Sequence, residues 1–124
     1  MDKQPKSDLT QIAKEFTAFI VKELGIQKPY KIKLSPTRTE AFTTHAYYNP
    51  SNGEIGVCIN KRQTADVLRS LAHEMIHHKQ NQEGRLKTGE EIPDIGGEIE
   101  DEANSVAGQL VKKFGYTTKH QIYE

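Results

Sequence analysis

Residues 73–77, His-Glu-Met-Ile-His, combine side chains that can bind a metal ion with one that can move a proton. Residues four apart lie on the same face of an α-helix, so His73 and His77 can direct two imidazole nitrogens at one metal ion. Glu74 lies about 100° further around that helix, within reach of a water molecule on the metal. The spacing therefore predicts two metal ligands, His73 and His77, and a general base, Glu74.

A catalytic zinc site needs a third protein ligand and keeps one position open for water. The extended metzincin pattern would place a glycine three residues after His77 and a histidine three residues beyond that glycine. This chain has Gln80 and Glu83 at those two places, which excludes the metzincin class. The third ligand must come from elsewhere, and the acidic stretch between residues 90 and 102 is the natural source.

The acidic start of the last predicted helix offers several carboxylates for this role. With about 100° per residue, Glu100 lies roughly 60° from the centre of the apolar stripe, Glu102 roughly 100° and Glu98 roughly 140°. Because a ligand must face the neighbouring helix, Glu100 is favoured, with Glu102 and Asp94 as alternatives. Asn104 follows Glu100 by one turn and could fix the tautomer of a ligand histidine by hydrogen bonding.

Two kinds of periodicity predict the elements that position these residues. Apolar residues at helical spacing predict three helices, over residues 8–24, 64–82 and 98–114. Alternation of polar and apolar residues, with many β-branched and aromatic side chains, predicts three strands, at 30–34, 42–48 and 54–60. The turn sequence at 49–53 predicts a hairpin between the last two strands. We therefore expect a single α+β domain over residues 1–124, with an N-terminal helix, a small three-stranded sheet and two C-terminal helices.

Composition narrows the possible partners and the setting. The 17 basic residues balance the 17 acidic ones, so we expect neither nucleic acid nor an anionic membrane as a partner. The single cysteine, Cys58, cannot form an intramolecular disulfide and is expected to be a small buried side chain. No apolar run resembles a signal peptide or a membrane span. These features predict a cytoplasmic protein.

Two segments of the chain together resemble the gluzincin metallopeptidases. They are Leu71 to His78, which contains the paired histidines, and Glu100 to Asn104. The likeness is greatest to the small intracellular forms, the ImmA/IrrE-like peptidases and the minimal gluzincins. In those families a strand ending in isoleucine and asparagine precedes the active-site helix, as Ile55 to Asn60 does here. Their glutamate motif, E-x-x-A-[DN], matches Glu100, Ala103 and Asn104, although Asn104 has no charge where an aspartate is also allowed.

This resemblance implies a zincin-like fold and a zinc-dependent peptidase. One zinc ion would be held by His73, His77 and Glu100. Glu74 would act as general base and then pass the proton to the leaving amine. The substrate would be a protein or peptide, paired in extended form with the edge of the sheet. The residues of that edge strand would be Ile55, Val57 and Ile59.

Several histidines and tyrosines have less defined roles. Tyr47, Tyr48 and His45 are candidates for stabilising an oxyanion, but tyrosine in a strand more often packs than reacts. His78 faces about 100° away from His77, so we expect it at the surface.

Two other interpretations of the chain stay open. One is a zinc-binding regulatory or interaction module without peptidase turnover. The other is a protein that needs no metal and is held together by its helices alone.

Overall fold

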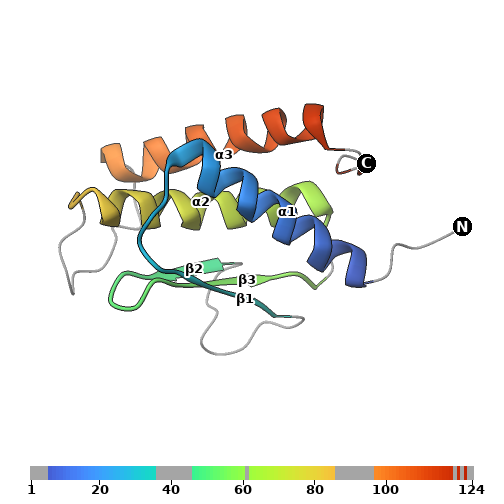
Figure 1. Ribbon diagram of the computed structural model, residues 1–124, viewed down its shortest axis with the longest axis horizontal. Helices are drawn as coiled ribbons and strands as arrows, with labels where there is room; N and C mark the ends of the chain where they lie inside the picture. Colours follow the sequence, from blue (N-terminus) through green and yellow to red (C-terminus); the bar gives the residue numbers. More distant parts are fainter. Residues whose placement is uncertain are drawn as a thin grey trace, which may run out of the picture.

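The computed structural model describes residues 6–35, 46–60, 62–85, 97–118, 120 and 122. Along the chain its elements are α1 (Lys6–Leu24), β1 (Lys31–Ser35), β2 (Ala46–Asn49), β3 (Glu54–Cys58), α2 (Thr64–Gln82) and α3 (Gly97–Thr117). The strands form one sheet, and the helices lie on one side of it (Figure 1). This confirms the predicted α+β class. The last helix is longer than predicted, because it continues through Gly115 to Thr117.

The sheet is mixed, and its strand order is β1-β3-β2. β2 pairs with β3 in antiparallel register, which confirms the predicted hairpin, and β1 pairs with β3 in parallel register. The prediction that the strand of Ile55, Val57 and Ile59 forms the sheet edge is wrong, since β3 is paired on both sides. Ile55 and Val57 are fully buried, and the backbone N–H of Ile59 donates to the carbonyl of Ser35. These residues therefore form core and sheet contacts, and β3 has no free edge for a substrate.

Helix α2 is the centre of the fold. It packs against α1, α3, β2 and β3, and α3 runs back along it in the opposite direction (Figure 1). Because other elements surround α2, polar side chains that a helical wheel places outside are buried: Glu74, His77, His78 and Gln80. The polar face of α2 is therefore an internal surface on which a site can be built.

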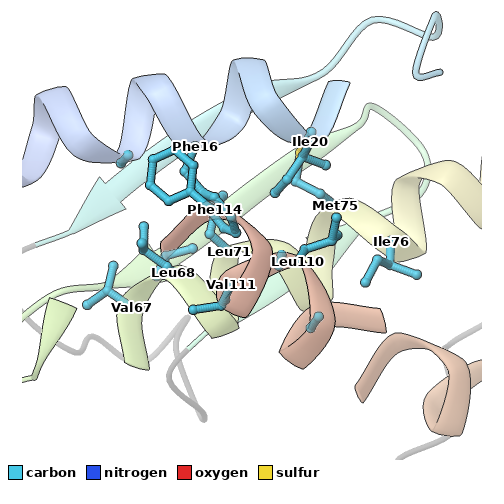
Figure 2. Packing of buried hydrophobic residues seen from close by; sticks show 14 of the residues in the cluster. Phe16, Ile20, Val67, Leu68, Leu71, Met75, Ile76, Leu110, Val111 and Phe114 are labelled. Atoms are coloured by element: carbon cyan, nitrogen blue, oxygen red, sulfur yellow. The ribbon is translucent and has the colours of Figure 1, made fainter. Parts of the chain in front are cut away.

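Apolar side chains from all three helices hold α2 and α3 in fixed positions. Figure 2 shows Phe16 of α1 near Phe114 of α3 and Leu71 of α2, and Ile20 of α1 near Met75 of α2, all within one cluster. The rings of Phe16 and Phe114 pack with centroids 4.9 Å apart. Each fully buried side chain of this size contributes about 1.5–3 kcal/mol. This packing keeps the start of α3 opposite the second half of α2, where the paired histidines lie.

Two expectations about composition can be compared with the fold. Cys58 is a free, buried cysteine, as predicted. Within the part of the chain that the structure describes, no helix combines the length and the apolar character that a membrane crossing requires. The cytoplasmic location stays a prediction.

Candidate metal centre

Potential metal-ligating atoms of three side chains, from two helices, converge at one point. His73 Nε2 lies 3.1 Å from Glu100 Oε1, and His77 Nε2 lies 3.0 Å from Glu100 Oε2. The Nε2 atoms of the two histidines are 3.1 Å apart. His73, His77 and Glu100 could therefore hold one metal ion. Glu100, the ligand favoured from the apolar stripe of its helix, is the carboxylate that meets the histidines.

The geometry and chemistry of this set fit zinc. A tetrahedral zinc ion with bonds of about 2.0–2.1 Å holds neighbouring ligand atoms about 3.3 Å apart. The closest approaches of 3.0–3.1 Å are a few tenths of an ångström shorter, and each histidine makes its approach to a different oxygen of Glu100. Two imidazoles and one carboxylate are a ligand set of catalytic zinc sites, which leaves a fourth position for water. His73 and Glu100 are 21% and 16% exposed, so solvent reaches the site from their side.

His77 is the buried ligand of the pair, with only 2% of its side chain exposed. Burial lowers the pKa of His77, and this is the largest influence on it. A ligand imidazole must be neutral to offer a lone pair to a metal. The environment of His77 thus favours the form that can bind.

Glu74 follows His73 on α2 and is not one of the three residues that converge. It is 8% exposed, and burial raises its pKa to about 8, with a further contribution from the charge of Glu100. The negative charge of Glu100 disfavours ionisation of Glu74, so the two carboxyl groups influence each other electrostatically. A carboxyl group beside a metal site, with a pKa near neutrality, has the properties of a general acid or base.

The main contact that the sequence did not reveal is made by Gln80. Its side chain is fully buried, and its Oε1 lies 2.8 Å from His77 Nδ1. Its Nε2 donates to the Ile99 carbonyl at 3.1 Å and to Glu102 Oε1 at 2.8 Å. The available signal was the spacing, since Gln80 follows His77 by nearly one helical turn. In the sequence, Gln80 was notable only because metzincins have a glycine at that position.

The other acidic candidates lie in different places. Glu102, the alternative ligand, binds Gln80 and also accepts from Arg85 Nη1 at 2.7 Å. These hydrogen bonds, that of Gln80 first, lower the pKa of Glu102. Glu98 is exposed, and Asp94 lies outside the described residues.

Asn104, expected to orient a ligand histidine, is exposed on α3. At His77 the contact of that kind is made by Gln80. A role for Asn104 towards His73 stays a prediction.

The expectation that His78 lies at the surface is wrong. His78 is fully buried, with its Nδ1 2.8 Å from the Tyr48 hydroxyl and its Nε2 2.8 Å from the Lys28 carbonyl. The prediction from the angular position of His78 on the helix failed because β2 and the segment before β1 cover this face of α2. His78 is thus a structural residue next to a candidate ligand.

The two tyrosines considered for the oxyanion have hydroxyl groups that are bonded within the fold. The Tyr47 hydroxyl donates to Glu54, and burial raises the pKa of Tyr47 to about 12. The Tyr48 hydroxyl contacts His78 and Asn81, although its ring stacks near His77 with centroids 6.5 Å apart. His45 lies outside the described residues.

Comparisons with known proteins identified no relative of this chain. No protein-family model matches the chain, and no curated protein or solved structure matches it significantly. The likeness to gluzincins therefore rests on the motif residues and on the convergence of His73, His77 and Glu100.

Proposed function

We propose that this protein is a zinc-dependent metallopeptidase of the gluzincin type, acting on a protein or peptide substrate. The observation that carries the proposal is the meeting of His73, His77 and Glu100 from two separate helices. The position of Glu74 on the same helix as the histidines, buried and influenced by Glu100, supports a catalytic rather than a purely structural ion. Among the described residues only these three side chains converge, whereas structural zinc sites close all four positions with protein ligands.

A cation at this point would account for the contacts among the three side chains. Each Nε2 offers a lone pair when its neutral ring carries the proton on Nδ1, and the Glu100 oxygens offer lone pairs too; the contacts among these atoms are 3.0–3.1 Å. Lone pairs at that distance repel unless a proton or a metal ion lies between them. A divalent ion would satisfy all three groups together, whereas a proton on each Nε2 would satisfy the two contacts with Glu100 and leave the two Nε2 atoms facing each other.

The chain's own residues then have separate tasks. Zinc, when bound, would lower the pKa of a coordinated water to about 7 and polarise the scissile carbonyl. Glu74 would accept the proton of that water and later donate it to the leaving amine. Its ionised form is favoured once positive charge offsets the repulsion from Glu100. His73 and Glu100, the more exposed ligands, lie on the side from which a substrate can approach.

Zinc content and proteolysis test the proposal together. Protein purified without added metal or chelator should contain about one zinc ion per chain. It should also cleave members of a peptide library. Glu74→Gln should keep the zinc but lose about 10²–10⁴-fold in cleavage rate, because it removes only the base. Glu100→Gln should lose both zinc and cleavage.

Two results would point elsewhere. Zinc binding without cleavage of any peptide by the wild type would favour the regulatory or interaction module. Cleavage by Glu74→Gln at the wild-type rate would exclude the proposed mechanism.

A further inference from the structure

We propose that Gln80 is a positioning residue that keeps the proton of His77 on Nδ1 and so leaves Nε2 ready for the metal. The inference deepens the proposed function, because it rests on His77 being a ligand. It depends on a chain of hydrogen bonds that runs from His77 through Gln80 and Glu102 to Arg85.

The orientation of the Gln80 amide follows from its partners. Its Nε2 faces two groups that can only accept a hydrogen bond, the Ile99 carbonyl at 3.1 Å and the Glu102 carboxylate at 2.8 Å. If the amide were flipped, its oxygen would face both acceptors, and two part-buried repulsive contacts would replace two hydrogen bonds. The NH₂ group must therefore point towards α3, and Oε1 must point towards His77.

The orientation of Gln80 determines where the proton of His77 lies. An amide oxygen 2.8 Å from Nδ1 can only accept, so Nδ1 must carry a proton and donate it. In a neutral ring the lone pair is then on Nε2, the atom that faces His73 and Glu100. Gln80 thus selects the tautomer that a metal ligand requires.

A competing acceptor makes this selection necessary. Glu100 Oε2 lies 3.0 Å from His77 Nε2, and in the metal-free protein this carboxylate draws the same proton towards Nε2. A proton on Nε2 would block the ligand atom. Gln80 opposes this shift of the proton, because an unprotonated Nδ1 would bring its lone pair against those of the amide oxygen.

Glu102 and Arg85 complete the support. The Glu102 carboxylate accepts from Gln80 Nε2 and from Arg85 Nη1 at 2.7 Å. It thereby holds the amide in place and polarises it, which strengthens the acceptor that His77 meets. This gives Glu102 a role in the site although it is not a ligand.

Zinc affinity, measured by competition with a chromophoric chelator, tests the role of Gln80 in binding. Gln80→Met keeps a similar length but removes the acceptor, and should weaken zinc binding by about 10–100-fold. Glu102→Gln should weaken binding less, because the Ile99 carbonyl still orients the amide.

Gln82→Met is the matched control. Gln82 lies on the same helix and also makes three hydrogen bonds, to the backbone of Gly25, Gln27 and Lys28. These bonds hold the segment before β1 and do not touch the ligands. Gln82→Met should therefore leave zinc affinity unchanged. An equal loss in both variants, or no loss in Gln80→Met, would overturn the proposal.

The protonation state of His77 in the metal-free protein separates this inference from the proposed function. Nitrogen-15 NMR of the imidazole rings, in chelator and above the pH at which histidines titrate, reports which nitrogen bears the proton. The wild type should show a protonated Nδ1, and Gln80→Met should shift the proton towards Nε2. A bare Nδ1 in the wild type would overturn the inference, whether or not the protein binds zinc.

Discussion

The hydroxyl of Tyr48 lies 2.8 Å from Nδ1 of His78 and joins strand β2 to the helix that carries the two candidate histidine ligands. The same hydroxyl accepts from Asn81 Nδ2 at 2.9 Å, while His78 Nε2 donates to the Lys28 carbonyl. Because Nε2 donates, Nδ1 of a neutral His78 is an acceptor and the tyrosine is its donor. This buried network fixes α2 against the sheet next to the metal centre.

Removing that hydroxyl should destabilise the fold without removing the ligands. Tyr48→Phe leaves His78 Nδ1 without its donor and Asn81 without one of its acceptors. An unsatisfied buried polar group costs about 1–3 kcal/mol, so the free energy of unfolding should fall by that amount. Urea denaturation followed by circular dichroism measures it.

Tyr47→Phe is the control for this change. It also removes a phenol hydroxyl, but Tyr47 is only partly buried and its partner is Glu54 on the same sheet. Its loss should be about 1 kcal/mol or less. Equal losses for the two variants would contradict the importance of the Tyr48–His78 contact.

The adjacent residues His77 and His78 should respond in opposite ways to substitution. His77→Ala removes a ligand atom and should abolish zinc binding. His78→Ala should keep one zinc ion per folded chain, but lower the free energy of unfolding by about 2–4 kcal/mol through lost hydrogen bonds and a cavity. Equilibrium dialysis with zinc and chemical denaturation separate the two effects. Loss of zinc from folded His78→Ala would contradict the assignment of His77 as the ligand.

Helical periodicity was sufficient to predict the three residues that converge at the candidate metal centre. Four-residue spacing placed His73 and His77 on one face, and the apolar stripe of the last helix showed that Glu100 faces inwards. Both arguments use only positions within one helix, and helix geometry relates such positions without knowledge of the tertiary fold. For the same reason the bounds of α2, Thr64–Gln82, agree with the prediction.

Features that depend on packing between distant segments could not be predicted in this way. Predicting exposure from the angular position of a residue assumes that one face of the helix is open to solvent. Helix α2 is covered on several sides, and His78 and Gln80 are therefore buried. Likewise, the alternation at Ile55 and Val57 is compatible with either an edge or a central strand. The parallel partner β1 decides between them, and its pairing with β3 joins residues far apart in sequence.

The buried carboxyl of Glu74 should make the stability of the metal-free protein depend on pH. Its pKa is about 8 in the fold, against 4.5 ordinarily, so the folded state keeps a proton that the unfolded chain releases. This contribution to stability is complete below pH 4.5 and is lost as the pH rises through 8. The total loss is on the order of a few kcal/mol.

Glu74→Gln removes this titration and provides the measurement. In chelator, the wild type should lose more stability between acid and alkaline pH than the variant does. Above the folded-state pKa, Glu74→Gln should be the more stable protein, because its neutral amide pays no penalty for ionisation. The free energy of unfolding is measured by urea denaturation at several pH values. If it changes with pH in the same way for both proteins, the pKa of Glu74 is not raised by burial in the fold.

Gly53 and Gly84 should differ in their tolerance of alanine, although both have positive φ angles, of 74° and 76°. A Cβ atom on Gly84 would meet nothing within 4 Å, so Gly84→Ala should cost only the conformational strain, about 1–2 kcal/mol. On Gly53 it would lie 2.7 Å from the Pro29 carbonyl oxygen and 3.2 Å from His78 Cε1. The backbone before β1 must then move, which disturbs the segment whose Lys28 carbonyl binds His78. Gly53→Ala should therefore lower the midpoint of thermal unfolding clearly more than Gly84→Ala does, and equal shifts would contradict the close approach of the hairpin turn to α2.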